Sequence, residues 1–551
     1  MYRCPNCGGD MTFSPEKQKL VCAYCDSEFT VDEFEAKKGV NADEHTVTEE
    51  APEFSEEDEK YFQATIFTCP QCGGEILSTT DTAATFCSFC GASVLLKSRV
   101  SNEMRPDMII PFKISKQQCE EEYKKKLSKA LFVPSEMKKD DEIEKFRSIY
   151  MPYWVYSYDY NGPIKTKGKT TSRRGDYIYT KHYDLTADAE LDYDGISFDA
   201  SSTFSDSLSE AVAPFDMKQA DSFKAAYMTG HYADTKDVNA DIYESDAADV
   251  VREHAIEEIY RNGDYAKYGI ARSDISVSFE PSLKSIKYGF FPVWFLASRS
   301  KKGDRVSYAV VNGQTGKIAA DLPVDLGKYL LGSLLLAVPV YLLLTFVFNF
   351  TFTPRVMLGL AIVLGIISIV IGNREYNKVY TRENYLDDKG YQTMNKKHEQ
   401  KNKKIKTKKG SVNFNVGDFL SGFGWIWIVI IGISVLSRLG PAGIGVIIVA
   451  VLVIIFMAFA KGIRGGKESE SRIFAAPMKE KAGMLIKPAI GIIAALVVVL
   501  WNPYQDPIHY GVAIASLALT VWTFTDIIKA HNRLTERKLP QLGRRGGDEN
   551  A

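Results

Sequence analysis

The amino-acid sequence predicts a multidomain protein with two small cysteine-rich β-ribbons, an α+β cytoplasmic domain and a six-helix α-helical transmembrane region. Three observations lead to this fold class. Eight of the nine cysteines fall in Cys-x-x-Cys pairs near the N-terminus. The middle of the chain mixes helical and alternating patterns, and after Lys328 apolar runs reach the roughly 20 residues that cross a bilayer.

Composition and charge exclude several classes of protein. The chain has 551 residues, and its 45% hydrophobic and 12% aromatic content excludes a disordered protein. Nine cysteines are too few for a disulfide-stapled secreted domain of this length. Residues 1–328 carry 40 basic and 55 acidic side chains, whereas the remainder carries 27 and 14, so the two parts have opposite charge.

The paired cysteines form two matching sets. In the first set a 14-residue spacer separates two Cys-x-x-Cys pairs, and the second set repeats it 65 positions later. The flanks repeat as well, as Cys-Pro-x-Cys-Gly-Gly in both copies, which indicates an internal duplication. The eight candidate metal ligands are Cys4, Cys7, Cys22, Cys25, Cys69, Cys72, Cys87 and Cys90.

This spacing is typical of a metal knuckle. Two residues between thiolates let a tight turn direct both sulfurs at one ion, and two knuckles supply the tetrahedral set that suits Zn²⁺. We therefore expect two zinc ions per chain, each supplying much of the folding free energy of a module of about 30 residues. Iron bound as in rubredoxin is the alternative. The ninth cysteine, Cys119, stands among carboxylates that disfavour a thiolate, and we expect no role for it.

The charge census of the ribbons argues against nucleic acid. Residues 66–96 contain no Lys or Arg, and residues 31–60 hold twelve acids against three lysines. Binding to a phosphate backbone needs basic side chains, so nucleic acid is an unlikely partner and a protein-facing or structural ribbon is favoured. We expect the acidic segment between the ribbons to be a disordered linker.

Six apolar runs predict three transmembrane hairpins joined by basic loops. The spans are Tyr329–Phe350, Val356–Gly372, Phe419–Leu436, Gly443–Ala460, Met484–Trp501 and His509–Thr525. The resulting domain boundaries are zinc ribbon 1 (1–30), acidic linker (31–65), zinc ribbon 2 (66–98), α+β domain (101–328), transmembrane hairpins (329–372, 419–460, 484–525), cytoplasmic loops (373–418, 461–483) and a basic cytoplasmic tail (526–551).

Positive charge predicts the orientation of these spans. Residues 373–412 hold twelve Lys and Arg, whereas the tight links between paired spans hold only Arg355 and Arg438. The positive-inside rule then places both termini in the cytoplasm of a multi-pass inner-membrane protein. Within one basic loop, Lys396–Lys409 has eight lysines in fourteen residues, and we expect it to bind anionic lipid or to act as a solvated topology determinant.

Ionisable groups lie only near the ends of the predicted spans. Lys487 and Asp526 fall near cytoplasmic ends and His509 near an outer end, where we expect each side chain to extend to the interface. Many ion-coupled transporters instead place such groups at membrane depth. The spans are therefore interpreted as an anchor or assembly surface, with transport as the weaker alternative.

The α+β domain shows both periodicities. Gln117–Leu131 and Ala240–Arg261 have helical spacing, and strands are expected at Tyr153–Tyr160, Asp176–Tyr183 and Arg305–Val311. Asn312–Gly316 predicts a tight hairpin before Lys317–Ala319. The similar segments Tyr150–Trp154 and Phe290–Trp294 each place a proline beside aromatics, which favours a sheet edge or strand entry packed in the core over a ligand groove.

No catalytic motif emerges. Gly313–Lys317 is too short for a phosphate-binding loop, and His254–Glu258 lacks the second histidine of a zinc-protease helix. The sequence therefore predicts a protein that is not an enzyme and implies no small-molecule substrate.

A set of short motifs, taken with the ribbons, resembles a known family. These motifs are Ile110-Pro-Phe112, Pro152-Tyr-Trp154, Ala213-Pro-Phe-Asp216, Tyr227-Met-Thr-Gly230, Pro292-Val-Trp294 and Asn312-Gly-Gln-Thr-Gly316, followed by membrane spans. The chain is similar over roughly residues 1–350 to bacterial membrane proteins described as containing a transcription-factor-IIB-type zinc ribbon. That resemblance implies a cytoplasm-facing, membrane-anchored protein, some relatives being associated with phage-shock-type envelope-stress proteins. Such chains are sometimes labelled as primosomal replication-restart helicase, but this chain lacks a helicase's nucleotide-binding loop.

These observations predict a polytopic scaffold or adaptor that recruits protein partners to the bilayer, with a role in envelope stress implied by the resemblance. Two alternatives remain open at this stage. A membrane-tethered nucleic-acid-binding protein would need basic surface on the ribbons. A zinc-ribbon-regulated transporter or channel would need polar groups at membrane depth.

Overall fold

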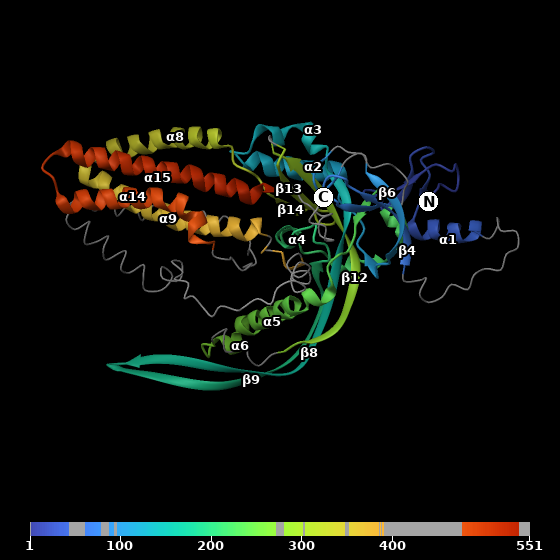
Figure 1. Ribbon diagram of the computed structural model, residues 1–551. Coiled ribbons are helices and arrows are strands. Elements are labelled where there is room, and N and C mark those ends of the chain that lie inside the picture. Colours follow the sequence, from blue (N-terminus) through green and yellow to red (C-terminus); the bar gives the residue numbers. More distant parts are fainter. Residues whose placement is uncertain are drawn as a thin grey trace, which may run out of the picture.

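A computed structural model describes residues 2–42, 61–78, 87–92, 96–270, 280–300, 303–347, 352–390 except 385 and 387, and 476–538. The architecture has three parts (Figure 1). A three-stranded ribbon lies at the N-terminal end, a large twisted sheet occupies the centre, and long helices extend from the sheet on the side away from the ribbon.

The strands fall into two sheets. The N-terminal sheet has the order β1-β2-β3, and the large sheet contains the path β10-β7-β12-β8-β11-β5-β4-β6 with β9, β13, β14 and β15 attached to it. The strands are β1 Met11–Ser14, β2 Lys19–Cys22, β3 Glu28–Phe29, β4 Tyr61–Thr68, β5 Glu75–Ser78, β6 Lys97–Met104, β7 Met108–Ile109, β8 Arg147–Arg174, β9 Tyr177–Asp199, β10 Asp221–Ser222, β11 Tyr232–Asp234, β12 Ser282–Arg299, β13 Arg305–Asn312, β14 Ile318–Ala320 and β15 Arg537–Lys538.

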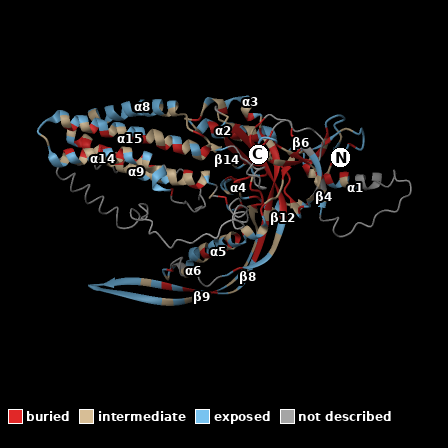
Figure 2. Ribbon diagram, viewed as in Figure 1, coloured by how far each residue is buried: buried red, intermediate tan, exposed pale blue. Residues whose placement is uncertain are grey.

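The described helices divide between the domain and the apolar region. Those of the domain are α1 Val31–Ala42, α2 Lys116–Lys129, α3 Asp140–Ile143, α4 Asp206–Val212, α5 Glu244–Arg261 and α6 Gly263–Ala266. Those of the apolar region are α8 Leu326–Leu342, α9 Pro354–Glu383, α14 Met478–Trp501 and α15 Asp506–Thr535. Figure 2 shows that buried residues are concentrated in the central sheet, whereas the helices of the apolar region carry many exposed residues.

The core lies on both faces of the central strands β8 and β12. Successive side chains of a strand point to opposite faces, so alternate residues enter two different clusters. Met151 and Phe291 belong to the cluster that includes α4 and the second cysteine set. Tyr150 and Phe290 belong to the cluster that includes α2. Burial on both faces explains why these strands have continuous apolar sequences rather than alternating ones.

The proline–aromatic segments lie in the middle of the sheet, so the prediction of an edge or strand entry is wrong. Pro152 pairs with Phe290, and Pro292 pairs with Tyr150, which relates β8 and β12 by an approximate two-fold axis. The missing N–H is tolerated because each proline lies where its strand exchanges neighbours. β8 pairs with β11 up to Tyr150 and with β9 from Tyr153. β12 makes the equivalent change from β7 to β13.

Core packing of these aromatics, rather than a ligand groove, is confirmed. The indoles of Trp154 and Trp294 occupy equivalent positions, and each Nε1–H donates to a backbone carbonyl at 2.8 Å, that of Val238 and that of Ile114 respectively. Tyr150 and Phe290 are fully buried. A buried indole therefore gains both apolar packing and a partner for its polar atom.

The other predicted elements of the α+β domain are present. Helices α2 and α5 and strands β8, β9 and β13 overlap the five predicted segments, with α2 ending two residues earlier and α5 beginning four residues later than predicted. β14 follows the predicted hairpin and pairs with β13. A capping box fixes the start of α2: the Ser115 hydroxyl accepts from the Gln118 N–H, and the Gln118 side chain accepts from the Ser115 N–H.

The predicted acidic linker differs from the structure at both ends. Helix α1 begins directly after ribbon 1, because Thr30 and Glu33 form a reciprocal capping box and Phe34 packs in the ribbon core. At the other end β4 starts at Tyr61 and pairs with β5 and β6. Local capping and apolar side chains outweigh the average composition of this segment. Its middle, 43–60, lies outside the described residues.

Four of the six predicted spans are described, and each is a helix. α8 with its π-helical continuation to Val347, α9, α14 and α15 are long and apolar enough to cross a membrane. The two remaining spans, Phe419–Leu436 and Gly443–Ala460, lie outside the described residues, so six spans stay a prediction. All four helices extend beyond the predicted spans: α8 begins at Leu326, α9 continues to Glu383, α14 begins at Met478 and α15 continues to Thr535.

These extensions connect the helices to the sheet. After α15 the chain forms β15, which pairs with β13 at Arg305 and Val306. The Arg305 guanidinium lies 3.2 Å from Glu383 at the end of α9. Asn532 of α15 exchanges two 2.8 Å hydrogen bonds with the backbone of Val324. The apolar helices and the sheet therefore share one continuous hydrogen-bonded network.

Candidate metal centres

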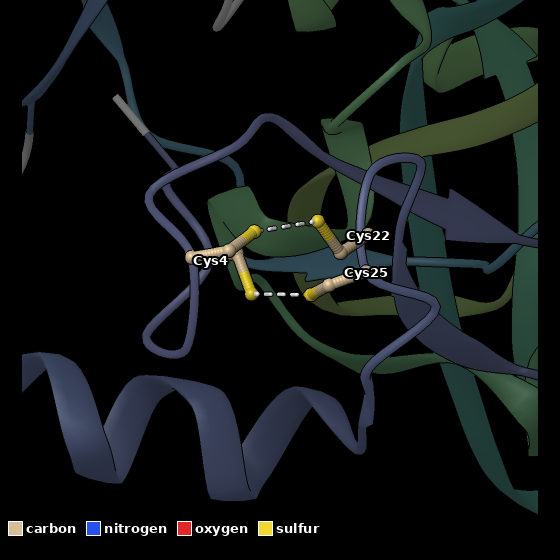
Figure 3. A group of neighbouring side chains, drawn as sticks. Cys4, Cys22 and Cys25 are labelled. Carbon is tan, nitrogen blue, oxygen red and sulfur yellow. Dashed lines mark hydrogen bonds between the residues drawn. The ribbon is translucent and has the colours of Figure 1, made fainter.

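The first cysteine set lies on two knuckles of ribbon 1. The Sγ atoms of Cys4 and Cys25 are 3.6 Å apart, and those of Cys7 and Cys22 are 3.4 Å apart (Figure 3). The Gly9 N–H donates to Cys7 Sγ at 3.4 Å, which is the amide approach that the Cys-Gly-Gly sequence favours. Cys4 and Cys22 are buried, whereas Cys7 and Cys25 are exposed.

The second set repeats this geometry at a buried position. Cys69 and Cys90 Sγ atoms are 3.9 Å apart, and those of Cys72 and Cys87 are 3.7 Å apart. The Gly74 N–H donates to Cys72 Sγ at 3.4 Å, as Gly9 does in the first set. All four cysteines are buried. The knuckles are therefore alike, and their surroundings differ.

Both groups of sulfurs fit a tetrahedral metal ion. A Zn–S bond of about 2.3 Å implies sulfur–sulfur distances of about 3.8 Å in a tetrahedron. In each set all four Sγ atoms lie within 4.8 Å of one another, and none forms a disulfide. The eight cysteines predicted from sequence are thus assembled into two groups of four, each able to hold a metal ion.

The Ser27 hydroxyl adds polarity to the first site. Its oxygen lies 3.1 Å from Cys25 Sγ, and this contact lowers the pKa of the Cys25 thiol to about 6. A thiolate is the form that ligates a metal, so this contact favours the ligand state at neutral pH.

Ribbon 1 rests on the large sheet through its strand β1. The Phe13 N–H donates to the Thr229 carbonyl at 2.9 Å, and the Phe13 carbonyl lies 3.3 Å from His231 Nε2. The His231 ring stacks on Phe112 at 4.7 Å, and its Nδ1 lies 2.8 Å from the Ser148 hydroxyl. Burial lowers the pKa of His231 to about 4, so the imidazole is neutral at pH 7.

Ribbon 2 belongs to the large sheet itself. Strand β5 pairs with β11, and the cysteines share a core cluster with central strands β8 and β12. The Tyr308 hydroxyl donates to the Phe89 carbonyl at 2.8 Å, and the Arg299 guanidinium donates to the Cys90 carbonyl at 2.6 Å. Arg299 and Tyr308 position the second knuckle, and sequence reasoning missed them because they lie more than 200 residues away.

Cys119 lies apart from both metal sites. It is fully buried on the face of α2 that packs against the sheet. Burial is the main reason why its pKa is raised, and the charge of Glu120 adds to the effect. The prediction that its thiolate is disfavoured therefore agrees in direction, with burial rather than the neighbouring carboxylates as the main cause.

The ionisable groups near the span ends are partnered within the helices. Lys487 of α14 forms an ion pair with Asp526 of α15, and its ammonium lies 4.4 Å from the centre of the Trp522 ring. Packing of α14 on α15 thus gives each of the two side chains an ion-pair partner that the sequence did not indicate, and their extension to the interface stays a prediction. His509 is buried, with Nδ1 3.3 Å from the Gln505 carbonyl. The predicted lipid-binding segment Lys396–Lys409 lies outside the described residues.

Comparison with known proteins gives one informative relative. The chain is 28% identical over 334 residues to the uncharacterized protein YdjG of Bacillus subtilis, a match that covers 59% of this chain and 91% of that protein. No family model matches the chain. No solved structure matches it.

Proposed function

We propose that this protein is a non-enzymatic, multi-pass membrane scaffold whose zinc-bearing cytoplasmic domain recruits protein partners to the bilayer. The observation that carries the proposal is the connection between the sheet and the apolar helices. Strand β15, the Arg305–Glu383 ion pair and the Asn532–Val324 hydrogen bonds join the ends of α9 and α15 to the sheet. A partner held by the domain would thus be held at a fixed place relative to the membrane.

Zinc is the metal that we propose for both sites. Four thiolates fill all four coordination positions, which is typical of structural Zn²⁺. A catalytic zinc site would keep one position open for water or substrate. Ribbon 2 lies within the core, so its ion would contribute directly to folding of the sheet. Iron in the same thiolate set is the alternative that metal analysis of the purified chain would reveal.

We further propose that both termini face the cytoplasm. In support, β15 lies beside β13, so the chain after α15 returns to the side that carries the domain. The basic loops counted in the sequence favour the same side. A reporter fused after Ala551 should then be accessible only from the cytoplasm, and accessibility from outside would contradict the orientation.

Ribbon 1 is the part of the domain that we propose for partner binding. Each of its two knuckles exposes one cysteine, Cys7 in the first and Cys25 in the second, and the Tyr24 side chain beside Cys25 is 76% exposed. Aromatic residues are enriched at protein interfaces, whereas ribbon 2 is covered by the sheet. The resemblance to phage-shock-associated relatives makes envelope-stress proteins the first candidates.

A crosslinking pull-down from membranes tests the scaffold proposal. The full-length protein is compared with a Cys7→Ser, Cys25→Ser variant, which removes the exposed ligands of ribbon 1. Glu16→Gln, a change of an exposed charge on the same ribbon, is the matched control. We expect the double variant to lose specific protein partners while remaining in the membrane, and the control to retain them. Unchanged partners, or recovery of nucleic acid instead of protein, would overturn the proposal.

A further inference from the structure

The β8–β9 hairpin extends far beyond the sheet. The two strands pair continuously from Tyr158–Tyr193 to Arg174–Tyr177, and Figure 2 shows the outer part as exposed. Residues 171–182 are exposed or half-buried on both faces of the ribbon. An isolated two-stranded ribbon is only marginally stable in water. An extension of this length is therefore expected to be stabilised by contact with another surface.

Charge is sharply divided along this hairpin. Its outer part, residues 165–182, holds six Lys and Arg against one Asp. The returning part of β9, residues 183–199, holds six Asp and Glu and no Lys or Arg. Within the described residues, no carboxylate forms a salt bridge with Lys167, Lys169 or Arg174. The outer part is therefore strongly positive. Asp184 of the returning part lies opposite Lys167, and the other acidic residues of β9 lie nearer the sheet.

Apolar side chains stand at the tip among these charges. Register pairs Arg174 with Tyr177 and Ser172 with Tyr179, so both tyrosines lie on one face of the ribbon. Ile178 lies on the other face, opposite Arg173. Tyr177 and Ile178 are 73% and 69% exposed. Tyrosine flanked by Lys and Arg is the composition found at membrane–water interfaces.

The direction of the hairpin brings this tip toward the bilayer. In Figure 1 the hairpin and the apolar helices extend from the sheet toward the same side of the molecule. The predicted span ends at Thr525, and α15 continues for ten more residues to Thr535. At about 1.5 Å per helical residue, the membrane and the sheet are therefore about 15 Å apart. At about 3.3 Å per residue, the outer half of β8 from Asn161 to Arg174 is roughly 43 Å long. The hairpin is thus more than long enough to reach the leaflet next to the domain, and in Figure 1 it extends past the sheet-side ends of the apolar helices.

We propose that the outer part of the β8–β9 hairpin, residues 165–182, binds anionic lipid headgroups of the leaflet next to the domain, with Tyr177 and Tyr179 at the interface. This inference rests on the proposed insertion of the helices in a membrane. Headgroups would pair with Lys167, Lys169 and Arg174, while the charges keep the ribbon out of the hydrocarbon. The domain would then meet the bilayer at two separate places, the helix ends and the hairpin tip.

Hydrogen–deuterium exchange of the full-length protein in nanodiscs tests this contact. One set of discs contains phosphatidylcholine only, and the other contains about one-third phosphatidylglycerol. We expect amide exchange in 171–182 to slow in the anionic discs at low salt, and the difference to disappear at high salt because surface charge is screened. Arg173→Gln with Arg174→Gln should weaken the lipid contact about 25-fold, at about fivefold per lost charge, and so remove most of the exchange difference. Lys17→Gln with Lys19→Gln on ribbon 1 removes equal charge elsewhere and should leave it unchanged.

Several outcomes would overturn the inference. If the protein enters both kinds of disc and tip exchange is the same in each, the hairpin contact is refuted while the membrane anchor stands. If tip exchange slows only when an oligonucleotide is added to phosphatidylcholine discs, the hairpin is a nucleic-acid element instead. Failure of the purified chain to enter discs would refute both the anchor and the contact.

Discussion

The two cysteine ribbons share one sequence pattern and have different places in the molecule. Ribbon 1 forms its own three-stranded sheet and keeps two of its four sulfurs exposed. Ribbon 2 contributes strands to the large sheet and buries all four. The knuckle distances are nevertheless similar, so cysteine spacing determines the metal site and the flanking residues determine how far the site enters a core.

The flanks explain this difference. The strand before Cys69 is β4, with the sequence Tyr-Phe-Gln-Ala-Thr-Ile-Phe-Thr, and its apolar residues enter the cores of the large sheet. Within the described residues, β1, β2 and β3 of ribbon 1 pair only with one another, so no strand of ribbon 1 enters the large sheet. The repeated motif thus has one candidate metal site in a small sheet of its own and one in the core of the large sheet.

The largest expected effect comes from ribbon 2. Cys87→Ser removes a buried candidate ligand in the core of the large sheet, and we expect the domain built on this sheet to unfold in purified full-length protein, with a loss of at least about 5 kcal/mol. Limited proteolysis and thermal unfolding measure this. If the variant kept the wild-type melting temperature, the buried cysteine set of ribbon 2 would not stabilise the large sheet, and the contrast with ribbon 1 would fail.

Loss of the first site should be local. Cys7→Ser should lower the metal content from two ions to one and leave the melting transition of the sheet within about 1 kcal/mol of wild type, because the core cluster of ribbon 1 includes only Ala226 and Tyr227 from the rest of the domain. Metal analysis and hydrogen exchange measure the two effects. In the unaltered protein a chelator should also remove the exposed ion at least tenfold faster, and equal rates would contradict the comparison.

The contact between ribbon 1 and the sheet should weaken in mild acid. The pKa of His231 is about 4 in the fold and about 6.5 when exposed, so the undocked state binds more protons between these values. Docking is unaffected above pH 6.5 and is weakened progressively as pH falls, by roughly 3 kcal/mol near pH 4. Hydrogen exchange of β1 between pH 7 and pH 5 measures the weakening of docking. This interval lies above the pH at which acid unfolds proteins in general. In the His231→Gln variant, the pH dependence of β1 exchange should be smaller. The same pH dependence in the variant and the wild type would show that groups other than His231 cause it.

The smallest effect should come from the ion pair at the edge of the same contact. Asp32 of α1 lies 2.7 Å from Lys224, and the Asp32 side chain is largely exposed. Because water screens such a pair, Asp32→Asn should change stability by less than about 1 kcal/mol. Thermal unfolding measures it, and a larger loss would mean that charge rather than Phe13 and His231 holds ribbon 1 in place.

Sequence could predict the parts that local spacing encodes. Cys-x-x-Cys pairs, the capping box at Ser115 and the apolar helices all depend on residues near one another in the chain. Three features depend on distant partners and were missed: the role of Arg299 at Cys90, the pairing of Lys487 with Asp526, and the place of Pro152. A central proline resembles an edge proline in sequence, because only the neighbours of the strand show that its N–H is not needed.

Strand β15 has a consequence for the order in which the protein is made. Strands β12, β13 and β14 leave the ribosome before any of the long apolar helices, but Arg537 and Lys538, which pair with β13, follow the last of them. The edge of β13 beside Arg305 therefore waits for its partner until α15 has been synthesised. Completion of the sheet would report that the last helix has taken its place, and a nascent chain stopped earlier would leave an open strand edge that quality-control proteases could recognise.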